Sequence, residues 1–160
     1  MHEIRLVGLV EFDHINYSKF SMTLEFPFCS FKCDRENGTQ VCQNWLLAKA
    51  NVNSYSIESI IDLYLKNPLT KSIVMQGLEP LDSFDELFDF ISLFRKRSND
   101  DVVIYTGFYP NEIDDKVKLL KKFNNIIIKY GRYIPNQESH YDEVLGVSLS
   151  SNNQFAEKIC

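Results

Sequence analysis

Apolar residues recur along the chain in two patterns that alternate. Short and nearly continuous apolar runs predict buried strands, and longer segments with apolar residues at helical spacing predict helices. The predicted strands are Ile4–Phe12, Phe20–Phe26, Ser72–Gln76, Val102–Tyr105 and Ile126–Lys129. The predicted helices are Ser56–Lys66, Ser83–Arg97 and Glu112–Phe123. The segment from Pro135 to Cys160 is polar and is expected to be irregular apart from Val144–Leu149.

The predicted helices carry recognisable end signals. Ser56 and Ser59 are suitable capping residues at the start of the first helix, and Pro68 blocks its continuation. Ser83 is the expected N-cap of the second helix. That helix has acidic residues in its first turn and basic residues in its last, which complements the helix dipole.

Strands separated by helices of this length imply β-α-β units and a mostly parallel sheet. We therefore expect an α/β fold in which residues 1–160 form a single domain, with helices on the outer face of the sheet. Ligands of such sheets bind at the carboxyl ends of the strands. Four loops are expected to converge there: Cys29–Cys42, Gly77–Pro80, Thr106–Gly107 and Gly131–Arg132.

Composition narrows the class of protein. A chain of 160 residues that is 44% hydrophobic is long enough for one domain with a core. Its net charge of −5 argues against a general nucleic-acid binder. No apolar stretch approaches the roughly 20 residues that cross a bilayer, and the acidic Glu3 and Glu11 are unlike a secretory signal. We expect a cytoplasmic protein with no membrane association, where clustered cysteines are usually metal-binding or catalytic.

Three of the four cysteines lie in one loop. Cys29, Cys33 and Cys42 are close enough in sequence to surround one metal centre, and their soft thiolates favour an iron–sulfur cluster or zinc. A structural zinc site would be completed by His140 or Cys160, although the paired CxxC knuckles typical of zinc are absent. A [4Fe–4S] cluster held by three cysteines would leave one iron free for another ligand. The loop alone leaves both alternatives open, together with a chance grouping.

Several segments, in order, resemble the radical S-adenosylmethionine (SAM) enzymes, specifically the anaerobic ribonucleotide reductase activating proteins. Cys29, Cys33 and Cys42 match the three cluster cysteines of that family, and the CQNW that starts at Cys42 resembles the stretch after the third cysteine. QGLEPL, from position 76, resembles the GGEPL stretch, and VIYTG, from position 103, resembles the strand that ends in YTG. KYGRYI, from position 129, and the late pair Asn153-Gln154 resemble the closing segments. The resemblance extends from about residue 20 to about residue 155.

The sequence departs from the family at two informative places. Relatives have the cysteine spacing CxxxCxxC, whereas DRENGTQV separates Cys33 from Cys42 here. The Asn37-Gly38 turn dipeptide would let the added residues bulge outward and return Cys42 to the cluster. The first glycine of GGEPL is Gln76.

The resemblance implies a small partial (β/α) barrel of the radical SAM type. It also implies that three thiolates hold a [4Fe–4S] cluster whose unique iron chelates the amino and carboxylate groups of SAM. One electron from a low-potential donor, such as flavodoxin or ferredoxin, would cleave SAM to methionine and a 5′-deoxyadenosyl radical. The implied substrate is a glycine Cα hydrogen of a partner glycyl-radical enzyme such as anaerobic ribonucleotide reductase.

The same resemblance assigns the SAM-binding residues. Glu79 is expected to accept hydrogen bonds from the SAM ammonium, and Gly77 to let the backbone come close. Lys129 would approach the SAM carboxylate if it points inward, and would otherwise be a solvated lysine at the end of a strand. The further expected contacts are Val41, near the adenine, and Asn44, Gln76, Thr106 and Gly107.

Two other functions remain open from the sequence. The first is a radical SAM enzyme of the same fold that acts on another protein, a peptide or a small molecule. The second belongs to a different class: a non-catalytic module that carries an iron–sulfur cluster for electron transfer or binds zinc.

Overall fold

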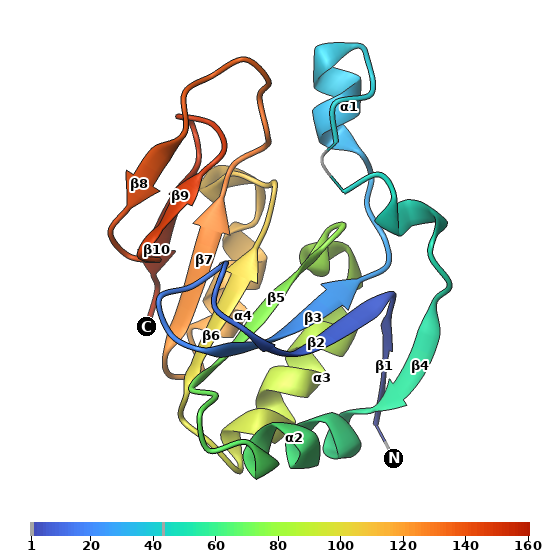
Figure 1. Cartoon of the computed structure of the whole chain (residues 1–160), viewed down its shortest axis with the longest axis vertical. Helices are drawn as coiled ribbons and strands as arrows, with labels where there is room; N and C mark the ends of the chain where they lie inside the picture. Colours follow the sequence, from blue (N-terminus) through green and yellow to red (C-terminus); the bar gives the residue numbers. More distant parts are fainter. Residues whose placement is uncertain (1, 43) are drawn as a thin grey trace.

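The computed structural model describes residues 2–42 and 44–160, and its main feature is a six-stranded sheet (Figure 1). Along the chain, these strands are β2 (Gly8–Asp13), β3 (Ser21–Phe26), β5 (Ser72–Gly77), β6 (Asp101–Tyr105), β7 (Ile126–Tyr130) and β10 (Phe155–Lys158). Their order across the sheet is β10-β7-β6-β5-β3-β2. The four central strands are parallel, and the two edge strands β2 and β10 are antiparallel to their neighbours. The expected α/β fold with a mostly parallel sheet is therefore confirmed.

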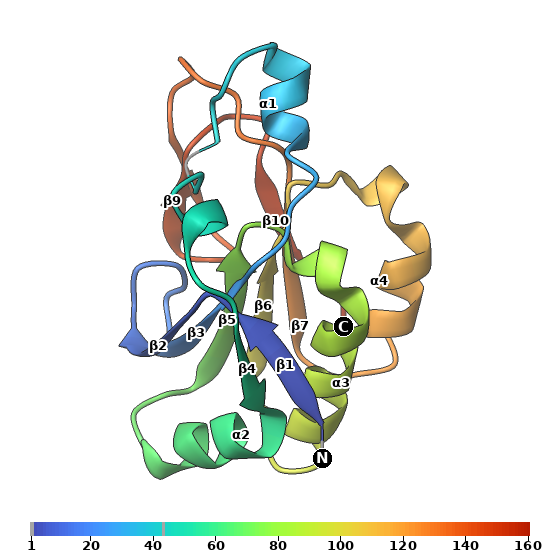
Figure 2. The ribbon, with the colours of Figure 1, turned by 90° about the vertical axis from the view of Figure 1, so that its right-hand side faces the viewer.

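The sheet is open rather than a closed barrel. Within the described part of the chain, the edge strands β2 and β10 pair only with β3 and β7 and not with each other. Helices α2 (Ile57–Lys66), α3 (Phe84–Arg95) and α4 (Asp114–Leu120) connect the parallel strands. In Figure 2, α3 and α4 lie on the same side of the sheet. In the described part of the chain, residues 2–42 and 44–160, no helix is long and apolar enough to cross a membrane.

Alternation along the parallel strands gives the sheet two apolar faces. Ile73, Met75, Val102 and Ile104 belong to the larger hydrophobic cluster, which includes the buried residues of α2 and α3. The residues between them face the other way, because successive side chains of a strand point to opposite faces. In the parallel strands these are Val74, Val103 and Ile127. They form a second cluster with Leu145 and Leu149 of the hairpin made by β8 (His140–Asp142) and β9 (Val147–Leu149). The hairpin therefore covers the face that the helices leave open.

The first predicted strand, Ile4–Phe12, is wrong as a single element. The structure has β1 (Glu3–Leu6), which pairs antiparallel with β4 (Asn53–Ser56), and then β2, which pairs with β3. The chain changes partner at Val7, whose N–H donates a hydrogen bond to the carbonyl of Glu25. The two strands belong to different sheets and differ in burial: β1 buries Ile4 and Leu6, whereas the residues of β2 are partly buried or exposed.

The predicted helices exist with shifted ends. Ser56 caps α2 as expected, since its Oγ accepts a hydrogen bond from the N–H of Ser59 at 3.2 Å. Ser83 precedes α3 but its side chain makes no capping hydrogen bond, because a 3₁₀ helix (Pro80–Ser83) runs directly into α3. The predicted helix Glu112–Phe123 is split into a 3₁₀ helix (Pro110–Glu112) and α4.

Other elements differ from the expectation. The polar tail contains three short strands, β8, β9 and β10, whereas only Val144–Leu149 was expected to be ordered. Strand β4 and a 3₁₀ helix (Leu47–Lys49) precede α2, and helix α1 (Lys32–Asn37) lies inside the cysteine loop. Figures 1 and 2 show α1 projecting beyond the carboxyl ends of the parallel strands, beside the C-terminal segment that leads to β8.

Candidate functional site

A cavity of about 370 Å³ lies at the carboxyl ends of the parallel strands. Residues from all four predicted loops line it, so the expected convergence of these loops is confirmed. Two segments that the sequence did not suggest also line it: Ile15 and Asn16 before β3, and residues 147–150 around β9. The phenol of Tyr105 fixes one of them by donating a hydrogen bond of 2.6 Å to the carbonyl of Asn16.

Three thiols share this cavity. Cys29, Cys33 and Cys42 are free, partly buried and all among the lining residues. Burial raises the pKa of each thiol, for Cys29 to about 12. Without a bound metal the neutral thiol is therefore the stable form, and a metal cation would favour the thiolate. No group of three His, Cys, Asp or Glu side chains in residues 2–42 and 44–160 is close enough to hold a metal ion. The three free thiols line one cavity and fit an iron–sulfur cluster as a donor set.

Cys160 lies far from these thiols along the sheet. Its carbonyl accepts a hydrogen bond from the N–H of Ile126, at the start of β7, and its Sγ is 3.8 Å from the carbonyl of Leu120. The cavity is at the other end of β7, where Lys129 and Gly131 line it. The alternative in which Cys160 completes a metal site with the cysteine loop is therefore wrong.

The residues added between Cys33 and Cys42 form part of a folded unit. Helix α1 begins after Phe31, which has a left-handed φ of 54°, and ends at Gly38, with φ of 70°. The expectation of a turn at Asn37-Gly38 is confirmed, but the helix before it was not expected. The Oδ1 atom of Asp34 then accepts hydrogen bonds from the N–H groups of Val41 and Cys42, both at 2.7 Å.

Glu79 is buried at the centre of the site. Its Oε1 accepts hydrogen bonds from the N–H of Leu81 at 3.0 Å and the hydroxyl of Thr106 at 2.9 Å. Its Oε2 accepts one from the N–H of Gly107 at 2.8 Å. Burial outweighs these bonds and raises the pKa of the carboxyl to about 7. A carboxylate has about four acceptor positions, so one on Oε2 remains for a ligand.

Glycine at position 77 is required by the packing of two strands. Its φ is 107°, and a Cβ there would lie 2.5 Å from the backbone nitrogen of Phe26. Asn44 donates a hydrogen bond of 3.0 Å from Nδ2 to the carbonyl of Gly77, which ties the cysteine loop to the end of β5. Gln76 and Asn44 both line the cavity, whereas Val41 is not among its lining residues.

Lys129 points into the protein rather than into solvent. Only 7% of the residue is exposed, and its ammonium donates a hydrogen bond of 3.1 Å to the carbonyl of Gly131. Burial lowers the pKa of the ammonium to about 8, although nearby Glu79 opposes this shift. The reading of Lys129 as a solvated lysine is therefore wrong. Gln154 lies beside it and donates to the same carbonyl at 3.3 Å.

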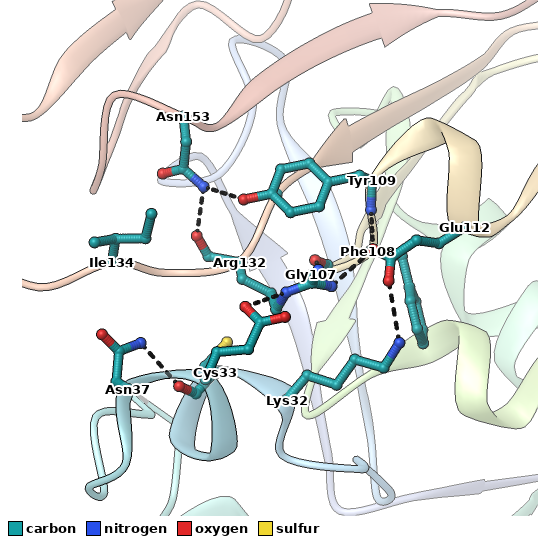
Figure 3. Close-up of polar contacts among 12 residues, drawn as sticks. Lys32, Cys33, Asn37, Gly107, Phe108, Tyr109, Glu112, Arg132, Ile134 and Asn153 are labelled. Atoms are coloured by element: carbon teal, nitrogen blue, oxygen red, sulfur yellow. Dashed lines mark hydrogen bonds and ion pairs between the residues drawn. The ribbon is translucent and has the colours of Figure 1, made fainter.

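Arg132 connects three segments around the cavity. Its Nε donates a hydrogen bond of 2.7 Å to Glu36 of α1, and its Nη1 donates to Glu112 at 2.8 Å and to the carbonyl of Gly107 at 3.2 Å. Lys32 donates to Glu112 at 3.2 Å, as the dashed lines of Figure 3 show. Burial alone would raise the pKa of the Glu112 carboxyl. The hydrogen bonds that it accepts outweigh burial and lower this pKa to about 2.

Asn153 holds the backbone of this arginine in place. Its Nδ2 donates hydrogen bonds of 2.8 Å to the carbonyl of Arg132 and to the hydroxyl of Tyr109 (Figure 3). The sequence singled out Arg132 and Asn153 only as parts of segments. It missed their partners Lys32, Glu36, Tyr109 and Glu112, because no local pattern connects residues so far apart in the chain.

Comparison with known proteins identifies the family. The model of the 4Fe-4S single cluster domain matches residues 21–156, which include the three cavity cysteines and every parallel strand. A comparison with curated proteins gave no match. Because the family model covers most of the chain, the protein belongs to the 4Fe-4S single cluster domain family.

Proposed function

We propose that the protein is a radical SAM enzyme that activates a glycyl-radical enzyme. The observation that carries this proposal is one cavity, in a chain of a 4Fe–4S family, lined by three free thiols, a buried carboxylate and a buried ammonium. The thiols suit a cluster with one open coordination position, while Glu79 and Lys129 have charges opposite to those of an amino acid's ammonium and carboxylate. SAM carries both of these groups on its methionine moiety.

Cys29, Cys33 and Cys42 would hold the cluster in this function. Backbone N–H groups already point at two of the sulfurs: Phe31 donates to Cys29 at 3.2 Å, and Asn44 donates to Cys42 at 3.4 Å. Such hydrogen bonds stabilise thiolates and tune the potential of a bound cluster. The chemistry supplied when cluster and SAM are bound is one-electron cleavage of the sulfonium S–C bond, which yields methionine and a 5′-deoxyadenosyl radical.

Glu79 and Lys129 would orient SAM from two strands. The free acceptor position on Glu79 Oε2 would receive the SAM ammonium, and the ammonium of Lys129 would turn from the carbonyl of Gly131 to the SAM carboxylate. Thr106 and Gly107 would act indirectly, because their hydrogen bonds fix the carboxylate of Glu79. Asn44 and Gly77 would keep the cysteine loop against β5. The contact of Val41 with the adenine stays a prediction.

The open sheet supports a macromolecular substrate. The edge strands β2 and β10 do not pair with each other, and this open side would let a loop of a partner protein reach the cavity, which a closed barrel would prevent. The proposed reaction moves a hydrogen atom from a glycine Cα of the partner to the 5′-deoxyadenosyl radical, giving 5′-deoxyadenosine and a glycyl radical. A low-potential donor, such as flavodoxin or ferredoxin, would supply the single electron.

Anaerobic reconstitution tests the proposal. We expect about four irons and four sulfides per chain, and an EPR signal of the reduced cluster that changes when SAM is added. Dithionite reduction with SAM should then produce 5′-deoxyadenosine, and addition of a glycyl-radical partner should give a glycyl EPR signal. One zinc and no iron per chain would overturn the proposal. A cluster that never cleaves SAM would instead indicate an electron-transfer module, and cleavage without a glycyl signal would indicate a different substrate.

A further inference from the structure

Asp34 holds the end of the loop between Cys33 and Cys42 through hydrogen bonds within the loop. Asp34 follows Cys33 directly, and its Oδ1 atom accepts hydrogen bonds from the backbone N–H groups of both Val41 and Cys42. Both bonds are 2.7 Å long, which is typical of a charge-assisted hydrogen bond. A single carboxylate oxygen therefore joins the residue after the second cysteine to the backbone of the third.

We propose that Asp34 is a positioning residue that returns Cys42 to the cavity. The inference rests on the proposed function, in which Cys42 is the third ligand of the cluster. Eight residues separate Cys33 from Cys42, and a longer loop costs more conformational entropy to close. The two hydrogen bonds to Asp34 offset that cost at the point where the loop re-enters the site.

The other side-chain contacts of the loop hold helix α1 or lie beyond Cys42, as does the bond of Asn44 to the carbonyl of Gly77. Glu36 binds Arg132, and Lys32 binds Glu112, so α1 is fixed against the loops that follow β6 and β7. The side-chain amide of Asn37 donates a hydrogen bond of 2.9 Å to the carbonyl of Cys33, and this bond lies within α1. None of these contacts holds the backbone of residues 39–42, whereas the Asp34 carboxylate does.

Alkylation of the apoprotein tests the inference without a cluster. Asp34→Ala removes the acceptor, Asp34→Asn keeps an oxygen that can accept both N–H groups, and Arg35→Ala changes an exposed neighbour on α1 as the matched control. Rates at Cys42, measured by mass spectrometry against Cys29 as internal reference, should rise about tenfold in Asp34→Ala, because the segment that carries Cys42 opens more often once its two hydrogen bonds are lost. Asp34→Asn and Arg35→Ala should stay within about twofold of the wild type. Equal rates in the wild type and Asp34→Ala would overturn the inference.

Iron retention gives the second measurement. After reconstitution, transfer of iron to a chelator should be about tenfold faster in Asp34→Ala than in the wild type, with rescue by Asp34→Asn. Equal loss in both variants would overturn the inference, because the asparagine retains the acceptor. Wild-type protein that binds no iron would refute the proposed function while leaving the alkylation result to decide the role of Asp34. Far-UV circular dichroism of each variant confirms that the comparison is between folded proteins.

Discussion

The Nε atom of Arg132 lies 2.7 Å from the Oε2 atom of Glu36, although the two residues are 96 positions apart in the chain. This contact joins the loop after the last parallel strand to the helix inside the cysteine loop. Because the same guanidinium also binds Glu112 and the carbonyl of Gly107, the walls of the cavity are fixed relative to one another by one side chain.

Arg132→Ala should lower the free energy of unfolding by about 2 kcal/mol, since it removes charge-assisted hydrogen bonds from a largely buried guanidinium. The loss is no larger because Glu36 is 54% exposed and water screens its interaction with Arg132. Urea unfolding of the apoprotein measures the loss. Arg97→Ala is the matched control: its pair with Asp62 is about half exposed on both sides, so its loss should stay below about 1 kcal/mol. Equal losses in the two variants would contradict the role given to Arg132.

Cys42→Ala should abolish cluster binding, while Cys160→Ala should leave it unchanged. The first removes a thiol from the cavity wall, and the second removes one beside Leu120 at the opposite end of β7. Iron and sulfide per chain after anaerobic reconstitution measure both effects. Retention of a full cluster by Cys42→Ala would show that the third ligand is elsewhere.

Glu79 should make the apoprotein less stable as the pH rises from about 4.5 to about 7. Its folded pKa is raised to about 7, so in this range the folded state holds a proton that the unfolded state has lost. The contribution is about 3 kcal/mol at most across the window, at about 1.4 kcal/mol per pH unit. Urea unfolding at several pH values checks it.

Glu79→Gln supplies the comparison, because the amide does not titrate. Its oxygen can keep the bonds to Leu81 and Thr106, but its NH₂ group would face the N–H of Gly107. The variant should show a flatter pH dependence of stability and at least about tenfold weaker SAM binding. If wild type and variant had parallel pH profiles, the carboxyl would not titrate in this range.

Lys129→Met should change stability and binding in opposite directions. Removing an ammonium that is costly to bury should raise the free energy of unfolding of the apoprotein by about 1–2 kcal/mol. Removing the proposed partner of the SAM carboxylate should weaken SAM binding at least about tenfold. Urea unfolding and calorimetric titration measure the two effects. A variant that loses stability yet binds SAM normally would show that Lys129 is structural.

The central strands were predictable from sequence because they are buried on both faces. Val102–Tyr105 and Ile126–Lys129 are continuous β-branched and aromatic runs, and their strand ends place the site loops at one edge. Helix α1 was not predictable in the same way. None of its residues is buried, so it has no apolar stripe, and its partner Arg132 is about a hundred residues away.

The direction in which a strand side chain points was the second feature that the sequence could not predict. The sequence could not decide whether Lys129 points inward, because strand parity depends on pairing that only the folded sheet defines. The division of Ile4–Phe12 into two strands was missed for the same reason, because it depends on strand pairing. Two short strands with different partners look like one apolar run until their registers are known.

The close packing of Gly77 against Phe26 sets different demands on two neighbouring positions of the QGLEPL segment. Gln76 lies within β5 and is not among the residues with positive φ, so a side chain there costs the backbone nothing. Gly77 has no such freedom, because any side chain would push two parallel strands apart. Position 77 therefore accepts only glycine, whereas position 76 accepts a side chain, and Gln76 lines the cavity there.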